Sequence, residues 1–253
     1  MAEGELFDES RCEYCVKGAG LDFDFSFAYQ PIIDAEERRV WGHEALVRGV
    51  NGEGAGTILS RVTEKNQYPF DQACRVRAVR LASQLGIDGF LSINFLPHAV
   101  YRPEHCIRTT LAAAKRYGVD TRKLMFELTE NQQLTSTDHL EDIIRTYQSL
   151  GFLTALDDFG AGYSRLNLLI SCPPQFLKLD MQLIRNIHES PRKQALVEGI
   201  ALSMDRLGIQ VIAEGVEYEE EYRWLRQQGI RYYQGFLFAK PGFEHFPEPY
   251  YPD

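Results

Sequence analysis

Short apolar runs recur along the chain after its first twenty residues, and each has the length of a β-strand. They predict eight strands, which span roughly residues 24–33, 38–48, 89–95, 123–128, 152–157, 175–180, 209–214 and 230–237. Between the later runs, the spacing predicts helices over 69–86, 104–117, 138–150, 192–207 and 218–229. Each helix is followed by a glycine where a left-handed C-terminal residue is common, namely Gly86, Gly118, Gly151, Gly208 and Gly229.

The alternation of strands and helices predicts an α/β protein with a mostly parallel sheet covered by helices. Eight strands over about 230 residues fit a TIM-type (β/α)8 barrel. The link Asp34–Arg38 between the first two strands is too short for a helical crossover. It indicates a hairpin, so we expect a modified barrel with an antiparallel first strand. A doubly wound open sheet is the alternative, although no GxGxxG motif follows the first strand.

Residues 1–21 differ from the rest, because they are polar and acidic and lack a sustained period. We expect a lead-in segment over 1–21 and one domain over 22–253. The lead-in contains Cys12 and Cys15 at CxxC spacing. No second cysteine or histidine pair completes a tetrahedral zinc site, so the interpretations are two free thiols or a zinc ion shared between two chains.

The composition bounds the compartment and the partners. No basic, then apolar, leader opens the chain, and no apolar run approaches the length of a membrane span. Five cysteines are an odd number for a disulfide framework, so we expect a cytoplasmic protein without a membrane partner. The 27 Lys and Arg against 36 Asp and Glu give a net charge of −9, which disfavours a broad surface for a nucleic-acid polymer. A small phosphate ligand remains compatible if metal ions mediate the contact.

Polar residues end nearly every predicted strand. A single strand-end residue is easily explained as a helix cap or a surface contact, but so many at one end of a barrel predict an active site at the C-terminal mouth. They are Glu44, Asn94, Glu127, Asp157, Asp158, Lys178, Glu214 and Gln234.

Six of these residues are oxygen donors, which favour Mg²⁺ or Mn²⁺ over zinc or copper. Five carboxylates in one mouth repel one another, and two divalent ions would neutralise four of the five charges. Adjacent aspartates such as Asp157 and Asp158 are well placed to serve two ions, the usual arrangement for phosphodiester cleavage. Arg48 shares a strand face with Glu44, roughly 13 Å further along at about 3.3 Å per residue. It is either a ligand contact or an ordinary exposed arginine.

The ordered motifs resemble those of EAL domains, the cyclic di-GMP phosphodiesterases. The resemblance covers about residues 24–242 and departs from the usual pattern at Gly49, Phe95-Leu96 and Ser164-Arg165. It is carried by Tyr29-Gln30-Pro31-Ile32, His43-Glu44-Ala45-Leu46-Val47-Arg48, Ser92-Ile93-Asn94, Phe126-Glu127-Leu128-Thr129-Glu130, Asp157-Asp158-Phe159-Gly160-Ala161-Gly162-Tyr163-Ser164, Leu177-Lys178-Leu179-Asp180, Ala213-Glu214-Gly215-Val216-Glu217 and Gln234-Gly235-Phe236.

The resemblance implies hydrolysis of cyclic di-GMP, a bacterial second messenger, to linear pGpG with two Mg²⁺ or Mn²⁺ ions. It implies that Glu44, Asn94, Glu127, Asp157, Asp158 and Glu214 bind the metals, and that Lys178, with Glu214 near it, holds or helps to activate the attacking water. Gln30, Arg48 and Gln234 would contact the ligand, Glu130 would support the 157–168 loop, and Glu217 would act nearby. The resemblance also implies a homodimer formed through the region around that loop.

Other interpretations remain. Lys178 among carboxylates is also explained as a structural ion pair. The domain as a whole is alternatively a cyclic di-GMP receptor with weak or no turnover, or a regulatory module that binds a protein partner. A different metal-dependent phosphodiesterase on a barrel is disfavoured by the order of the motifs.

Overall fold

The computed structural model describes residues 21–129, 137–162 and 166–252, and its strands form one closed barrel. The hydrogen-bonded order is β2-β3-β4-β5-β6-β7-β8-β1, and β1 also pairs with β2. The barrel strands are β1 (Ser26–Asp34), β2 (Arg39–Arg48), β3 (Phe90–Asn94), β4 (Leu124–Thr129), β5 (Leu153–Phe159), β6 (Phe176–Leu179), β7 (Gln210–Ala213) and β8 (Tyr232–Tyr233). All eight predicted strands are therefore present, and the open-sheet alternative is wrong.

The first strand runs against its neighbours, as the short link predicts. β1 pairs antiparallel with β2 and with β8, whereas the pairs from β2–β3 through β7–β8 are all parallel. In the β1–β2 hairpin, Gln30 lies opposite Glu44. The two residues therefore enter the barrel at the same level.

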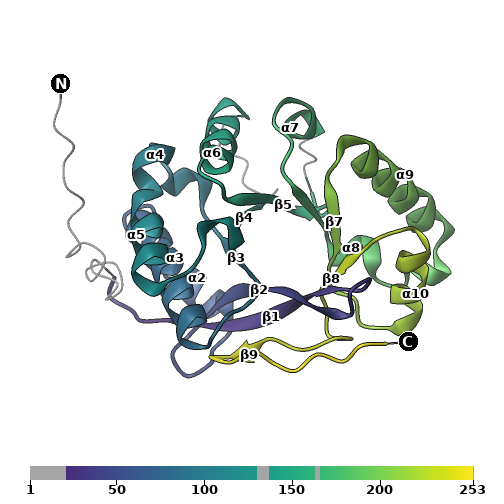
Figure 1. Cartoon of the computed structure of the whole chain (residues 1–253), viewed down its shortest axis with the longest axis horizontal. Helices are drawn as coiled ribbons and strands as arrows, with labels where there is room; N and C mark the ends of the chain where they lie inside the picture. Colours follow the sequence, from purple (N-terminus) through teal and green to yellow (C-terminus); the bar gives the residue numbers. More distant parts are fainter. Residues whose placement is uncertain (1–20, 130–136, 163–165, 253) are drawn as a thin grey trace.

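Helices cover the outside of the barrel along β2 to β8 (Figure 1). The five predicted helices are present, although the one expected over 104–117 is divided in two, and all five predicted glycines have positive φ. Three further helices of four to six residues, α2, α7 and α8, are too short to show a period in the sequence. The α-helices are α2 (Ala55–Leu59), α3 (Gln67–Gln84), α4 (Pro103–Cys106), α5 (Arg108–Tyr117), α6 (Thr137–Ser149), α7 (Leu166–Ser171), α8 (Met181–Ile184), α9 (Pro191–Leu207) and α10 (Glu219–Gln227). Short 3-10 turns lie at Pro97–Ala99, Thr121–Lys123 and Ile187–Glu189.

The end of the chain differs most from the prediction. The strand expected over 230–237 is limited to Tyr232–Tyr233, and the following residues hydrogen-bond to the loop after β7. A further two-residue strand, β9 (Gly242–Phe243), pairs antiparallel with β1 along the edge opposite to β2, and it is drawn lowest in Figure 1. Phe246 then packs on Tyr29 and on His43, with ring centres 5.1 and 4.1 Å apart. This C-terminal segment covers the strand pair that lacks a crossover helix.

Two hydrophobic clusters build the core. The larger one lies between the sheet and the helices, and the smaller one fills the barrel near the N-terminal ends of its strands. In the smaller cluster, Trp41 stacks on Phe90 at 4.2 Å and contacts Phe176 and Tyr232 at 4.9 and 5.4 Å. Aromatic side chains thus fill one end of the barrel and leave its other end to polar groups.

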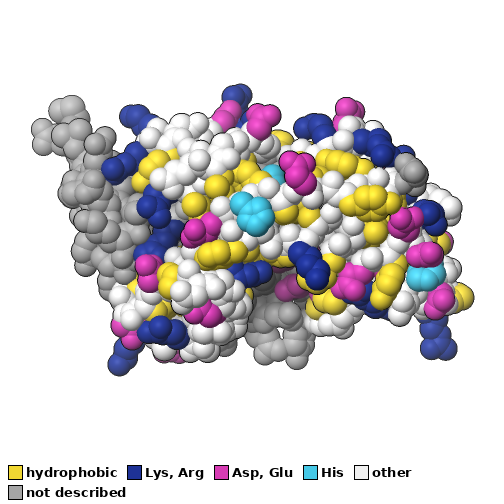
Figure 2. All heavy atoms as spheres, turned by 90° about the horizontal axis from the view of Figure 1, so that it is seen from below, with side chains coloured by type: hydrophobic (Ala, Val, Ile, Leu, Met, Phe, Trp, Pro, Cys, Tyr) yellow, Lys and Arg dark blue, Asp and Glu magenta, His cyan; other side chains and the backbone are white. Residues whose placement is uncertain are grey.

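The remaining sequence expectations concern thiols and surface. Cys74, Cys106 and Cys172 are buried free thiols, whereas Cys12 and Cys15 lie outside the described residues. Among the described helices, none has the length and apolar character to span a membrane. On the face that carries β1 and β9, basic side chains are scattered among acidic and hydrophobic ones (Figure 2).

Candidate active site

Lys178 lies at the centre of the polar end of the barrel. Its side chain is 1% exposed, and its Nζ atom contacts carboxylates from four different parts of the barrel wall. The distances are 3.3 Å to Glu44, 2.9 Å to Glu127, 3.1 Å to Asp157 and 2.7 Å to Glu214. The structure therefore gathers at one point the acidic residues that were predicted from separate strand ends.

Side-chain amides hydrogen-bond to the carboxylate of Glu44 and to one another. Asn94 Nδ2 donates to Glu44 Oε1 at 2.6 Å, and Gln234 Nε2 donates to Glu44 Oε2 at 2.8 Å. Gln234 Nε2 also reaches Gln30 Oε1 at 3.2 Å, so the antiparallel strand takes part in the same network. Each of the eight barrel strands, or the residue directly after it, thus supplies a polar side chain to the mouth.

Ser92 belongs to this network and is absent from the set of predicted site residues. Its hydroxyl donates to Glu127 Oε1 at 2.5 Å, and both side chains are buried. The signal was present in the sequence, because Ser92 precedes Asn94 by two residues and so shares its strand face. A buried hydroxyl that fixes one glutamate oxygen leaves the other oxygen, Oε2, directed at Lys178.

Asp157 and Asp158 lie side by side through a local irregularity of the backbone. Consecutive residues of a regular strand point to opposite faces. Here the β5–β6 register shifts between Leu156 and Phe159, and Asp158 has φ +57°, in the left-handed region. Both carboxylates consequently come within 4.8 Å of each other and of Glu214. A strained non-glycine residue beside a polar cluster is typical of functional sites.

Burial and charge shift the ionisation of these groups in opposite directions. Burial opposes the charge of Lys178, but the surrounding carboxylates raise its pKa well above the ordinary value. Burial raises the pKa of Glu127 and of Glu214 well above the ordinary value. For Glu44, burial acts in the same direction, but the charge of Lys178 and the hydrogen bonds from Gln234 and Asn94 together outweigh burial and lower its pKa. Lys178 is thus a permanent cation, whereas part of the carboxylate cage retains a tendency to bind protons.

Asp158 is the carboxylate of this group with a moderate shift. Burial, reinforced by the negative charge of Asp157, raises the pKa of Asp158 to about 6. Both causes are removed by a cation placed between the two aspartates, because it offsets their repulsion and replaces lost hydration.

The donor set fits a divalent oxygen-binding cation. Asp157, Asp158 and Glu214 offer carboxylate oxygens within 4.8 Å of one another. Glu127 Oε2 and Asp157 Oδ1 are buried, and among the described residues each has the Lys178 ammonium as its ion-pair partner and accepts no other hydrogen bond. All ligand atoms are hard oxygens, which suit Mg²⁺ or Mn²⁺. Of the six predicted metal ligands, three form this tight group, and Glu44, Asn94 and Glu127 join it through Lys178 and hydrogen bonds.

The predicted ligand-contacting residues lie around this centre. Arg48 is half-buried, and its Nη1 donates to the carbonyl of Val47 at 2.7 Å. Burial lowers the pKa of Arg48, and the charge of Glu44 acts in the opposite direction, so the two residues lie within electrostatic reach. Gln30 Nε2 donates to the carbonyl of Ala239 at 3.2 Å.

The two predicted supporting residues have different outcomes. Glu217, which lies beyond the C-terminal end of β7, forms an ion pair with Arg185 at 2.6 Å, and among the described residues it forms none with Lys178. Glu130 lies outside the described residues.

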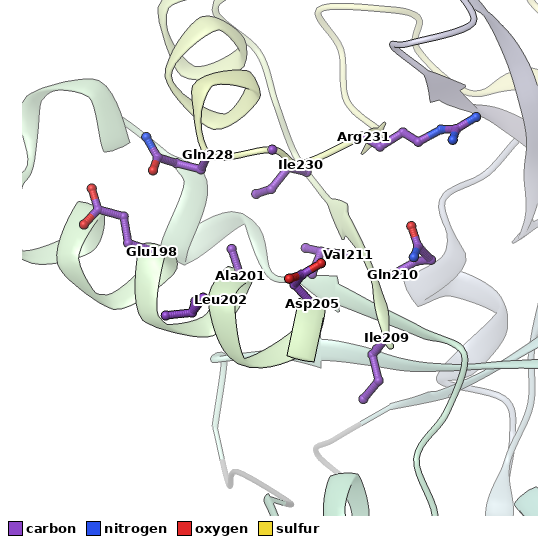
Figure 3. A pocket seen from close by; sticks show the side chains of 11 residues that line it. Glu198, Ala201, Leu202, Asp205, Ile209, Gln210, Val211, Gln228, Ile230 and Arg231 are labelled. Atoms are coloured by element: carbon purple, nitrogen blue, oxygen red, sulfur yellow. The ribbon is translucent and has the colours of Figure 1, made fainter. Parts of the chain in front are cut away.

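A second hollow lies at the other end of the barrel. Its volume is about 400 Å³, and it is lined from α9, from the start of β7 and from the residues before β8 (Figure 3). Glu198 and Asp205 on α9 and Arg231 before β8 are among its polar groups. Arg231 is already held by Asp34 at 2.6 Å. The candidate active site is therefore the carboxylate cage at the opposite mouth.

Comparison with known proteins identifies similar domains. The EAL domain family model matches residues 21–241. The crystal structure of a standalone versatile EAL protein from Vibrio cholerae O395, in its c-di-GMP-bound form, is 50% identical, with a TM-score of 0.89 and coverage of 91% of this chain and 98% of that chain. BlrP1 from Klebsiella pneumoniae, in a manganese and cyclic di-GMP complex at pH 9.0, is 34% identical, with a TM-score of 0.84 and coverage of 92% of this chain and 60% of that chain.

Curated relatives have different stated roles. The blue light- and temperature-regulated antirepressor BluF of Escherichia coli (strain K12) is 30% identical over 90% of this chain and 57% of its own length. The cyclic di-GMP phosphodiesterase PdeR of the same strain is 44% identical over 46% of this chain and 17% of its own length. The chain thus spans less than two thirds of these relatives.

Proposed function

Because the chain belongs to the EAL domain family, we propose that it hydrolyses cyclic di-GMP to linear pGpG with two Mg²⁺ or Mn²⁺ ions. The observation that carries the proposal is the cage of carboxylates around Lys178, with Asp157, Asp158 and Glu214 close enough to share a cation. The EAL protein of Vibrio cholerae O395 and BlrP1 have been solved with cyclic di-GMP bound, the latter with manganese.

In this proposal, Asp157, Asp158 and Glu214 hold the cations together with Glu44, Asn94 and Glu127. Divalent ions in this position supply positive charge for the phosphate oxygens and make a bound water more acidic. The pairing of Ser92 with Glu127 and of Asn94 with Glu44 sets which oxygens remain for the cations. Both oxygens of Glu44 already accept hydrogen bonds, Oε1 from Asn94 and Oε2 from Gln234 and Lys178, so a cation that binds Glu44 would replace one of these contacts.

Lys178 acts as a donor and not as a base. Its pKa is raised well above the ordinary value by the carboxylates that outweigh burial, so it stays protonated at neutral pH. The ammonium group can therefore orient a water by donating a hydrogen bond and can offset negative charge that develops on it. Glu214 Oε1 is 2.7 Å from this ammonium, which places it within reach of a water held there and so suits a group that receives a proton from that water.

The reaction consumes one water molecule. A bond forms from the water oxygen to phosphorus, the bond from phosphorus to the 3′ oxygen breaks, and that oxygen leaves as a hydroxyl group after it gains a proton. Arg48 is within electrostatic reach of Glu44, so we assign it to a phosphate or base carbonyl of the ligand. Gln30 and Gln234 form one hydrogen-bonded pair beside Glu44 and are assigned to the same side of the ligand.

The proposed assembly is a homodimer formed around α7, which begins after the loop that follows β5. Leu166 and Ile170 on this helix are 57% and 77% exposed, which is unusual for large aliphatic side chains. A two-fold contact would bury this patch on both chains and bring it next to the two aspartates of each site. A cytoplasmic location remains a prediction of the sequence.

A second candidate function is a receptor or regulatory role without turnover. It is favoured by the relative BluF, which is named an antirepressor. The site itself argues for the enzyme, because every carboxylate predicted to bind metal is present and joined in one network.

The test is incubation of the purified protein with cyclic di-GMP and Mn²⁺, followed by chromatographic separation of the nucleotides. We expect pGpG from the wild type and none from Asp157→Asn, while Glu198→Gln, in the distant pocket, remains active. Binding of cyclic di-GMP without product would support the receptor, and neither binding nor product would leave the partner-binding role.

A further inference from the structure

A fully buried arginine lies behind the candidate active site, on the outer side of the sheet. Arg75 is in the middle of α3, which packs against β3 outside the barrel, and the residue is 0% exposed. Its Nη2 atom is 2.8 Å from Asp71 Oδ2 one turn earlier in the helix, and its Nη1 donates to the Tyr147 hydroxyl of α6 at 2.6 Å. The guanidinium thus joins α3 to α6 on the outside of the barrel.

Stability alone is a poor reason for this arrangement. Replacing a buried ion pair by apolar side chains of similar volume is often neutral or stabilising, because the charges lose their hydration. Arg75 Nε is buried and donates no hydrogen bond to any of the described residues, so even the pairing with Asp71 leaves the guanidinium incompletely satisfied. Buried ion pairs of this kind are retained in some proteins because they select one arrangement of the surrounding chain.

The surroundings of Arg75 point to the candidate active site. The guanidinium carbon lies 5.2 Å from the ring centres of both Phe95 and Phe126. Phe95 directly follows Asn94, and Phe126 directly precedes Glu127. Because neighbouring residues of a strand point to opposite faces, the two rings face Arg75 while the two polar side chains face Lys178.

The same two strands are linked at this level in other ways. Asn94 and Glu127 are register partners in the β3–β4 pair, and the Phe95 amide donates to the Glu127 carbonyl at 3.4 Å. Asp71 Oδ1 accepts the amide of Leu96 at 2.9 Å, so the chain leaving β3 is held by the carboxylate that holds Arg75. The Asp71–Arg75 ion pair therefore contacts groups next to both Asn94 and Glu127, namely the Phe95 and Phe126 rings and the Leu96 amide.

We propose that Arg75, held by Asp71, is a positioning residue that sets the ends of β3 and β4 and so aims Asn94 and Glu127 into the cation site. This inference rests on the proposed function, because it assigns Arg75 a part in building the site that performs it. The planar guanidinium suits this role, since it lies against two rings and also donates in fixed directions. A lysine at the same position supplies the positive charge, but it has no planar group to lie against the rings and no pair of donors in fixed directions.

The test compares Asp71→Asn/Arg75→Met with the wild type. The asparagine keeps an oxygen for the Leu96 amide, and the methionine keeps most of the apolar volume without leaving an unpaired charge. We expect an unchanged melting temperature within a few degrees, a Mn²⁺ dissociation constant at least tenfold higher by calorimetry, and a displaced Asn94 side-chain amide signal in a ¹H–¹⁵N spectrum. The matched control is Arg226→Met, which removes an exposed guanidinium 5.9 Å from the Tyr222 ring and should change none of these values.

A folded double variant with the wild-type Mn²⁺ affinity and Asn94 signal would overturn the proposal and leave Arg75 as a packing residue only. If the double variant does not fold, Arg75→Lys decides, because it keeps the charge opposite Asp71. Weakened Mn²⁺ binding in that folded variant supports positioning, and wild-type binding overturns it. Failure of the proposed function can be told apart from failure of this inference. A wild type that binds Mn²⁺ but leaves cyclic di-GMP intact contradicts hydrolysis, whereas the Asn94 signal still tests the role of Arg75.

Discussion

Lys178→Met removes the one ammonium that contacts four carboxylates, and it leaves a side chain of similar length. Breaking a buried ion pair by removing one partner costs about 3–5 kcal/mol, because the remaining charge is uncompensated. For a domain of this size, 1 kcal/mol corresponds to about 2–4 °C in melting temperature. Without metal, we therefore expect the variant to melt about 6–20 °C below the wild type.

If divalent cations bind in the same cage of carboxylates, as proposed, they should narrow this difference in melting temperature. A ligand at one hundred times its dissociation constant stabilises the native state by about 2.7 kcal/mol. In the methionine variant no ammonium competes with Mn²⁺ for the carboxylates. Mn²⁺ should therefore raise the melting temperature of this variant more than that of the wild type. Its turnover at saturating Mn²⁺ should nevertheless fall by about 10²–10⁴, the usual contribution of a group that acts on the reacting proton or water.

The assay combines thermal unfolding with and without Mn²⁺ and steady-state hydrolysis of cyclic di-GMP. The exposed Lys65 provides a matched control, since Lys65→Met changes the same charge outside the site. A Lys178→Met protein with wild-type turnover would refute the assignment of Lys178 to the chemistry. Equal stabilisation of both proteins by Mn²⁺ would refute the idea that the ammonium and the cations share one cage.

Three further predictions concern the scaffold and the assembly. Asp34 is buried, and burial alone would raise its pKa, but the hydrogen bonds and charge of Arg231 together with the amides of Glu36 and Glu37 outweigh burial and lower it. Asp34→Asn should therefore lower the free energy of unfolding by about 3 kcal/mol at pH 7 in denaturant titrations, and this difference should shrink as the pH falls below about 4, the ordinary carboxyl pKa. A difference that persists at low pH would contradict the ion pair. Gly215, which directly follows Glu214, has φ +65°, and a Cβ there would lie 2.5 Å from Met181 Cβ. Gly215→Ala should therefore displace the loop that carries Glu214 and raise the Mn²⁺ concentration needed for half-maximal turnover. An unchanged Mn²⁺ requirement would show that the loop adapts. If the proposed homodimer forms through α7, Ile170→Glu should shift the protein from dimer to monomer in analytical ultracentrifugation. A monomeric wild type would contradict the proposed dimer, and a variant that stays dimeric would contradict the contact through α7.

Much of the fold was predictable because its signals are local. Strands 39–48 and 124–129 follow from apolar runs, and the glycines after the helices follow from the need for positive φ. The hairpin between β1 and β2 follows from the length of its link. These features depend on a few neighbouring residues, so the sequence alone expresses them.

Other features depend on contacts between distant segments. β9 has two residues and exists because Ala28 and Tyr29 offer it a partner. Helix α3 buries Asp71 and Arg75, which a hydrophobic pattern assigns to solvent, and these charges are compatible with burial because they pair with each other and with groups on other elements. The hydrophobic periodicity of the helix therefore does not predict that Asp71 and Arg75 are buried.

The candidate site was predictable in composition but only partly in geometry. Glu44, Glu127 and Glu214 were identified because each is a polar residue within or directly after an apolar strand, and the barrel brings the C-terminal parts of its parallel strands together. The sequence does not show that Asp158 adopts a left-handed conformation, and only this turn places it beside Asp157. The bulge arises where β5 loses its register with β6, a property of two strands and not of one.

The most direct measurement of the central claim is the rate of pGpG formation from cyclic di-GMP as Mn²⁺ is titrated into metal-free protein. The account predicts no product without the metal, a saturable increase with Mn²⁺, and loss of that increase in Asp158→Asn. Product at the full rate in the presence of a chelator, or an Asp158→Asn protein with the wild-type titration curve, would contradict it.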